Sequence, residues 1–264
     1  AKIISETEQN IDKKLPFPFE PFRSHVLKKA DFVIGRNAEA VEILRCKGYK
    51  GPDQVVPNAV DTSLFGPQNR DFCREQLDLK GFVVGYVGRL VEEKGTGDLI
   101  DALAHCPAEV NLVFVGSGPF ESELKNVVAS AGLEQRVRFL GARPLEELPT
   151  IFGAFDTLVL PSRTTASWKE QFGRVLIEAA ACEIPVIGSS SGAIPEVVGT
   201  GEAAIGIIFP EKDVTKLADA ITTLKNDAEL ARKLGGTGAQ RAREEFSWSQ
   251  VAERMAGIYR EVAR

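Results

Sequence analysis

The fold is decided by the stretch Phe82-Val83-Val84-Gly85-Tyr86-Val87-Gly88-Arg89-Leu90-Val91-Glu92-Glu93-Lys94-Gly95. Residues 82–87 are a short apolar run typical of a buried strand, and the glycine after them indicates a turn. A helical pattern follows over residues 95–105. A strand, a loop and a helix in this order are typical of a βαβ unit, because parallel strands are joined through a helix that covers one face of the sheet. The stretch therefore predicts an α/β fold.

The same alternation of strand and helix continues along the chain. We expect strands at residues 82–87, 110–115, 136–140, 156–160, 184–188 and 205–209. We expect helices between them at residues 95–105, 119–131, 145–153, 173–182 and 194–199, and after them at 213–225, 227–234, 237–245 and 248–262. Right-handed crossovers then give a doubly wound, Rossmann-like parallel sheet with an all-helical C-terminal tail. Because ligands of such sheets bind beyond the carboxyl ends of the strands, the loops after the strands are expected to share one rim.

Two cations lie in the loop after the first of these strands. Arg89 and Lys94 are five positions apart, next to Gly88. Arginine presents a rigid fork to phosphate oxygens and lysine a compact charge, so this spacing favours a diphosphate clamp. The alternative is that both cations pair with Glu92 and Glu93 on the surface.

A second candidate site is the stretch Glu170-Gln171-Phe172-Gly173-Arg174-Val175-Leu176-Ile177-Glu178. The apolar period predicts a helix that begins near Gly173, and a helix N-terminus offers unpaired N–H groups and a positive dipole end to a phosphate. Glu178 lies about one and a half turns along this helix, where a carboxylate can accept hydrogen bonds from a ribose diol. Glu170 precedes the helix, where a sugar would lie. The alternative is an ordinary amphipathic helix with a solvated glutamate at each end.

In this order the motifs resemble the retaining, nucleotide-sugar-dependent glycosyltransferases of family 4, which have the GT-B fold. The resemblance rests first on the two cations beside glycines and on the paired glutamates described above. Further segments agree in order: Leu112–Pro119, Val137–Gly141, Leu158–Ser162, Pro185–Gly188 and Ser191–Glu196. The resemblance covers about residues 55–264.

The resemblance implies catalytic roles for Arg89 and Lys94, which neutralise the diphosphate as the sugar–phosphate bond breaks. The phosphate site would be completed by Gly88 and by backbone N–H groups at the helix start: Gly173, Arg174 and Val175. Many relatives have a small or apolar residue at the position of Arg174. Here Arg174 either adds a cation at the diphosphate or pairs with Glu178 four residues on, and the pairing is slightly favoured.

The resemblance also implies how the rest of the donor is held. Glu178 would bind the ribose hydroxyls. Glu170, the third catalytic residue, would orient the sugar together with the backbone of Gln171 and Phe172. Arg143 would frame the nucleobase.

The implied reaction moves a hexosyl group from a UDP-, GDP- or ADP-linked sugar to a hydroxyl acceptor with retention of configuration. The resemblance favours a front-face displacement, although a carboxylate such as Glu170 is also a possible covalent nucleophile. The chain has no Asp-x-Asp pair, so we expect a metal-independent reaction with no cofactor. Two alternatives remain: a non-catalytic nucleotide-sugar-binding module, and a GT-B sugar-nucleotide epimerase. A nicotinamide enzyme is disfavoured because no G-x-G-x-x-G motif follows the first strand.

We expect four parts along the chain. Residues 1–56, with helices at 22–29 and 38–47 around a strand at 31–35, would be the end of an acceptor-side domain. The remaining parts are a linker at residues 57–68, the donor-binding domain at 69–246 and a C-terminal helix at 247–264. The resemblance implies that most of the acceptor-side domain is missing from this chain.

Composition is typical of a soluble globular protein: 264 residues, 44% of them hydrophobic, with a net charge of −5. This charge argues against nucleic-acid binding, because no basic stripe stands out. The four cysteines are widely spaced and predict free thiols rather than disulfides. No apolar run approaches the ~20 residues of a membrane span. We expect a cytoplasmic protein, with peripheral contact at the inner face of the membrane only through the missing domain.

Overall fold

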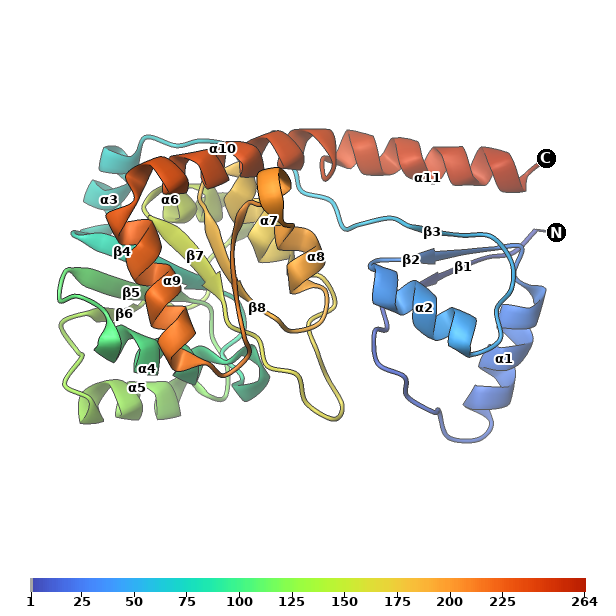
Figure 1. Ribbon diagram of the computed structural model, residues 1–264, viewed down its shortest axis with the longest axis horizontal. Helices are drawn as coiled ribbons and strands as arrows, with labels where there is room; N and C mark the ends of the chain where they lie inside the picture. The colour runs from blue at the N-terminus through green and yellow to red at the C-terminus, as the bar shows by residue number, and fades with distance from the viewer. Residues whose placement is uncertain (1) are drawn as a thin grey trace.

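The computed structural model describes residues 2–264 and contains two α/β units side by side (Figure 1). The first unit has a parallel sheet of three strands in the order β1 (Ile4–Thr7), β2 (Phe32–Gly35) and β3 (Asp53–Val55). Helices α1 (Phe19–Lys29) and α2 (Ala38–Cys46) precede and follow the middle strand. Strand β1 was not predicted, because its alternating polar sequence Ile-Ser-Glu-Thr carries little apolar signal.

The second unit is built on a parallel sheet of six strands. Their order is β6 (Val137–Phe139), β5 (Val110–Val115), β4 (Phe82–Val87), β7 (Thr157–Leu160), β8 (Val186–Ser189) and β9 (Gly206–Phe209). All neighbours are parallel. The strand order reverses between β4 and β7, which is the switch point at which doubly wound sheets bind ligands. The predicted fold class is confirmed.

Helices cover both faces of the six-stranded sheet (Figure 1). One face carries α4 (Thr96–His105), α5 (Glu121–Ser130) and α9 (Val214–Asn226). The other carries α3 (Arg70–Leu77), α6 (Leu148–Gly153), α7 (Arg174–Ala181) and α10 (Ala228–Glu244). Shorter pieces complete the unit: η1 (Glu92–Lys94), η2 (Leu145–Glu147), α8 (Ile194–Val198) and η3 (Gly201–Ala203). The four central strands, β5, β4, β7 and β8, are buried on both faces, and one continuous hydrophobic core fills this unit.

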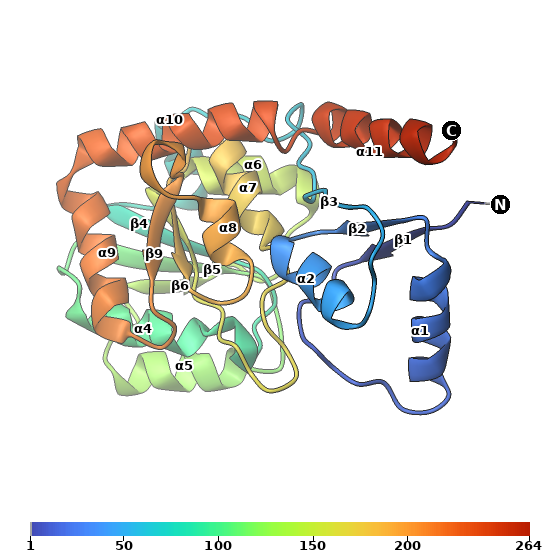
Figure 2. The same cartoon turned by 45° about the vertical axis from the view of Figure 1, so that its right-hand side comes forward.

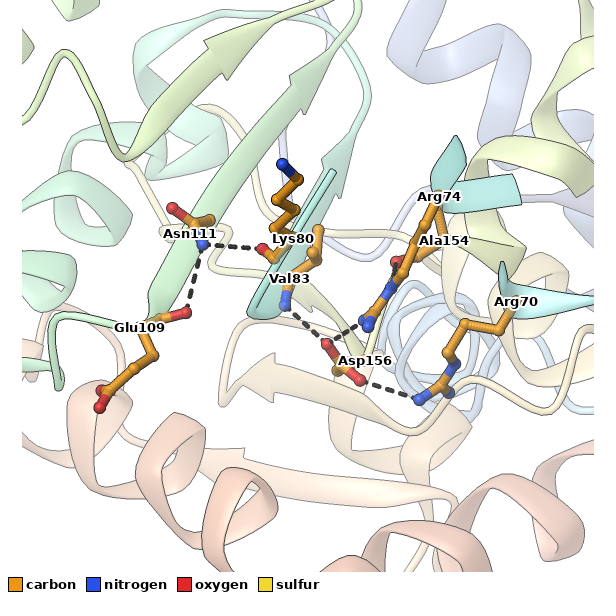
Figure 3. Close-up of polar contacts among 8 residues, drawn as sticks. All are labelled: Arg70, Arg74, Lys80, Val83, Glu109, Asn111, Ala154 and Asp156. Carbon is orange, nitrogen blue, oxygen red and sulfur yellow. Dashed lines mark hydrogen bonds and ion pairs between the residues drawn. The ribbon is translucent and has the colours of Figure 1, made fainter. Parts of the chain in front are cut away.

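Helix α3, which was not predicted, is fastened to the amino-terminal edge of the sheet through Asp156 (Figure 3). The Asp156 carboxylate accepts a hydrogen bond from Arg70 Nη1 at 2.9 Å, another from Arg74 Nη2 at 2.5 Å and a third from the Val83 N–H at 2.6 Å. Arg74 also donates through Nε to the Ala154 carbonyl at 3.1 Å. One carboxylate therefore ties α3 to β4 and to the start of β7, at the edge opposite the predicted site.

The last helix, α11 (Trp248–Val262), belongs to the first unit by its contacts (Figure 2). Val251 and Ile258 pack with Phe32, Ile34 and Val56 in a separate hydrophobic cluster. The expected C-terminal tail is therefore helical, but it covers the three-stranded sheet. None of the helices in residues 2–264 is both long and apolar enough to cross a membrane, and all four cysteines are free thiols.

Helix α10 runs unbroken where the sequence predicted two helices at 227–234 and 237–245. Gly235, between the two predicted helices, and Gly238, inside the second, allow close packing instead of a break. A Cβ at Gly235 would lie 2.2 Å from the Glu183 carbonyl oxygen, and one at Gly238 would lie 3.1 Å from Ala180 Cβ. Close contact with α7 and the turn after it therefore outweighs the weak helix propensity of glycine.

Gly235→Ala is expected to destabilise the protein, because the new methyl group forces α10 away from backbone that cannot yield. We expect a loss of about 1–3 kcal/mol in the free energy of unfolding, measured by urea titration. Gly236→Ala is the matched control, since nothing lies within 4 Å of a Cβ there. It should be neutral or stabilise the helix by up to ~1 kcal/mol. Equal losses in both variants would contradict the packing argument.

Candidate functional site

The carboxyl-terminal rim of the six-stranded sheet opens into a cleft of about 630 Å³ between the two units. All the predicted site residues except Arg143 line it. The first unit contributes Glu8 and Arg36 to the same cleft, and the connecting segment contributes Asn58. A cavity of about 620 Å³ lies at the opposite edge, beside Arg70 and Asp156, where strands begin rather than end. The cleft at the rim is therefore the candidate site, because it lies where this fold binds ligands.

The loop after β4 is held in a single shape by close backbone contacts. Tyr86 Oη donates a hydrogen bond to the Arg89 carbonyl at 2.7 Å. A Cβ at Gly116 would lie 1.9 Å from the Gly88 carbonyl oxygen, so the loops after β4 and β5 touch directly. Burial raises the pKa of the Tyr86 hydroxyl far above its ordinary value, which keeps it a neutral donor. Arg89 is thereby presented on a fixed loop, with its side chain exposed at the cleft.

Helix α7 begins at the cleft wall. Gly173 is its N-cap residue, with a left-handed φ of 80°, and a Cβ there would lie 2.8 Å from Leu160 Cδ2. Only glycine combines this conformation with this contact. The first N–H groups of a helix have no acceptor within it, so those of Gly173, Arg174 and Val175 are available to an anion in the cleft.

Glu170 and Lys94 come from different loops and form an ion pair. Lys94 Nζ lies 2.6 Å from Glu170 Oε2, and the buried Ser162 hydroxyl donates to the same oxygen at 2.7 Å. The Glu170 side chain is only 9% exposed. Lys94 Nζ also lies 4.8 Å from the centre of the Trp168 ring. Lys94 therefore pairs with Glu170, and the alternative pairing with its neighbours Glu92 and Glu93 is wrong.

Glu178 lies half-buried on the side of α7 that faces the cleft. Burial raises the pKa of its carboxyl above the ordinary value of 4.5, and the nearby Arg174 opposes this only in part. The sequence slightly favoured an ion pair between Arg174 and Glu178. The ion pairs of the described residues, 2–264, do not include it. Arg174 is instead exposed, so the Glu178 carboxylate is not occupied by a neighbouring cation.

Arg143 lies outside the cleft. Its Nε donates to the Leu140 carbonyl at 3.1 Å, and its Nη1 lies 3.4 Å from a carboxylate oxygen of Glu147. Sequence reasoning also missed residues that contact the site. Ser162 follows a predicted strand and was assigned no role. Asn10 and Asn37 donate to the loop that carries Glu170, and only the fold brings them there from the first 56 residues.

The chain belongs to a known family. Residues 68–241 match the model of the glycosyl transferases group 1 family. The chain is 32% identical to an alpha-maltose-1-phosphate synthase of Mycolicibacterium smegmatis over 239 residues, which are 84% of this chain and 60% of that protein. It is 31% identical to the lipopolysaccharide core biosynthesis mannosyltransferase LpsB of Rhizobium meliloti, over 90% of this chain and 68% of that protein.

Solved structures agree with this assignment. The structure of Anabaena Alr3699/HepE in complex with UDP and glucose superposes with a TM-score of 0.84 and 26% sequence identity. The match covers 98% of this chain and 72% of that one. The fold is therefore the GT-B fold of glycosyltransferases. The chain spans about half to two thirds of the length of the curated relatives it matches.

Glu178→Gln is expected to change the dependence of stability on pH. The raised pKa means that the folded protein holds the proton more tightly than the unfolded chain, so stability is lost as pH rises above about 4.5. Glutamine removes this loss. The melting temperature of the variant should therefore exceed that of the wild type at pH 7, and the gain should shrink towards pH 4. The matched control is Glu253→Gln, at an exposed position in the middle of α11 and outside the cleft, which measures the effect of the substitution itself. If the difference in melting temperature between Glu178→Gln and the wild type were the same at every pH, the raised pKa of Glu178 would be contradicted.

Proposed function

We propose that the protein transfers a hexosyl group from a nucleoside diphosphate sugar to a hydroxyl acceptor, with retention of configuration and without a metal ion. The observation that carries the proposal is the convergence in one cleft of charged side chains around a helix N-terminus: Arg89, Lys94, Glu170 and Glu178. These groups come from the loop after β4, the loop after β7 and helix α7. Together they match the parts of the donor: a diphosphate, a ribose and a sugar.

The diphosphate is the leaving group. When the bond between the anomeric carbon and the phosphate oxygen breaks, its electron pair stays on the diphosphate, and the acceptor oxygen bonds to the carbon as its proton leaves. Arg89, Lys94 and the first N–H groups of α7 would stabilise the charge that develops. The proton would pass to a diphosphate oxygen in a front-face displacement, with Glu170 orienting the sugar hydroxyls and Glu178 the ribose.

UDP is the first nucleotide to test, because the Anabaena neighbour was solved with UDP and glucose. GDP is the second, since a relative from Corynebacterium glutamicum is named a GDP-mannose-dependent mannosyltransferase. The acceptor, and any contact with the inner face of a membrane, stay predictions.

A second candidate is that this chain by itself binds a nucleotide sugar without turning it over. The observation in its favour is that the chain spans only 60% of the length of the alpha-maltose-1-phosphate synthase of Mycolicibacterium smegmatis. The two candidates differ in turnover. Transfer by the full-length protein, together with donor binding but no transfer by residues 1–264, would assign catalysis to the whole protein and binding to this chain.

Lys94→Ala is expected to weaken both binding and transfer. Loss of a charge-assisted contact should reduce affinity for the nucleoside diphosphate about tenfold or more by calorimetric titration. Loss of leaving-group stabilisation should reduce kcat of the full-length protein by about 10²–10³-fold. Lys125→Ala is the control, because Lys125 is paired with Glu121 on the surface of α5. Unchanged binding and transfer in Lys94→Ala would contradict the proposed donor site.

Transfer should be insensitive to chelators. Fixed cations supply the charge stabilisation in this proposal, so excess EDTA should leave the initial rate of the full-length protein unchanged. The rate is compared in EDTA alone and in EDTA with saturating magnesium. Loss of the rate in EDTA and its recovery with magnesium would contradict the metal-independent mechanism.

A further inference from the structure

Two buried asparagines of the first unit contact the loop that carries Glu170. Asn10 is 2% exposed and follows β1, and Asn37 is 1% exposed and follows β2. Asn10 Nδ2 donates to the Glu170 carbonyl at 2.7 Å, and Asn37 Nδ2 donates to the Gln171 carbonyl at 2.6 Å. The carbonyls of two consecutive loop residues therefore each accept a hydrogen bond from an asparagine of the first unit. One asparagine follows β1 and the other follows β2.

The amide of Asn37 is oriented by its own helix, and the carbonyl that Asn10 contacts is held from the second unit as well. Asn37 is the N-cap residue of α2, where its Oδ1 accepts the Ala40 N–H at 2.8 Å. This contact fixes which end of the amide faces the loop, so Nδ2 points at Gln171. The Glu170 carbonyl also accepts the Ala193 N–H at 3.0 Å, and a Cβ at Gly192 would lie 2.0 Å from that carbonyl. The loop backbone is thus enclosed from both units.

Weaker contacts surround this pair of hydrogen bonds. Lys169, at the start of the same loop, forms an ion pair with Glu39 of α2. The Ala38 N–H donates to Glu196 of α8 at 3.0 Å. The contacts between α2 and the second unit therefore gather around the residues that precede α7.

We propose that Asn10 and Asn37 are positioning residues for the donor sugar, and that they hold Glu170 and Gln171 in the sugar-binding conformation when the two units meet. The inference rests on the proposed function, which gives Glu170 its role at the sugar. The diphosphate is held by other groups, which are Arg89, Lys94 and the start of α7, and the side-chain amides of the two asparagines bond none of them. Loss of the asparagine contacts should therefore weaken recognition of the sugar and leave recognition of the nucleotide unchanged.

The test is Asn37→Asp in the full-length protein. Aspartate keeps the acceptor that caps α2, but it replaces the amide donor with a carboxylate that repels the Gln171 carbonyl. Affinity for UDP alone should stay within about twofold of the wild type. Transfer from the UDP-sugar, as kcat/KM, should fall roughly five- to hundredfold. Backbone amides of residues 169–173 should exchange hydrogen faster.

Asn69→Asp is the matched control. Asn69 caps α3 through the same contact, with Oδ1 accepting the Phe72 N–H at 3.1 Å, and it is exposed far from the cleft. It should match the wild type in melting temperature, transfer and exchange, because an exposed aspartate caps a helix as well as asparagine does. Asn10→Asp should repeat the Asn37→Asp result.

Unchanged transfer and unchanged exchange at residues 169–173 in Asn37→Asp would overturn this inference and leave the proposed function intact. An equal loss of UDP affinity and of transfer would also overturn it, since the role would then not be specific to the sugar. A wild-type protein that neither binds nucleotides nor transfers a sugar would overturn the proposed function, and with it the role assigned to the asparagines.

Discussion

The ion pair between Lys94 and Glu170 is the contact on which the architecture of the cleft depends. It joins the loop after β4 to the loop before α7, two segments that are 76 residues apart in sequence. A charged pair removed from water is stable only when its remaining hydrogen bonds are satisfied. Ser162 supplies one of them to the carboxylate, from the end of β7. One carboxylate oxygen therefore holds the loop after β4 against both ends of the loop between β7 and α7.

The glycines near this pair allow the loops to approach one another. Gly95 has a left-handed φ of 66°, and a Cβ there would lie 2.0 Å from the Pro161 carbonyl oxygen. The end of η1 and the residue before Ser162 are thus in contact through backbone. Any side chain at position 95 would move Lys94 away from Glu170. The electrostatics of the site therefore follow from backbone packing beneath it.

The chain crosses between the two units twice, at nearly the same place. Residues 57–68 lead from the first unit to the second, and the chain returns after Phe246. The Val60 N–H donates to the Phe246 carbonyl at 2.8 Å, and Val60 forms a β-bridge with Ser247. Two adjacent chain segments therefore connect the units. Contacts across the cleft, such as those of the two asparagines, then decide how firmly the units meet.

The sequence predicted what depends on local periodicity and spacing. Every strand of the six-stranded sheet was expected, because buried parallel strands are short, continuous apolar runs. The convergence of Arg89 and Glu170 followed from the rule that strand ends share a rim. The break in α10 was a wrong prediction, because packing of Gly235 on another segment has no local signal. The roles of Asn10 and Asn37 depend on how two units meet, and no spacing within one segment reports that.

The distribution of charge in the cleft shows where an anion is attracted most strongly. Lys94 is paired with Glu170, and the guanidinium of Arg36 is paired with Glu6 and lies 3.8 Å from Glu8. Within residues 2–264, Arg89 and Arg174 form no ion pair.

The unpaired positive charge of the cleft is therefore two guanidinium groups beside the N-terminus of α7. Arginine forks suit phosphate oxygens, and the helix end adds a partial charge of the same sign. A diphosphate placed there meets its counter-charge without breaking the Lys94–Glu170 pair. Because Arg174 does not pair with Glu178, both the cation and the carboxylate remain available to the donor. The departure from the family pattern at Arg174 thus adds to the proposed diphosphate site without competing for the ribose.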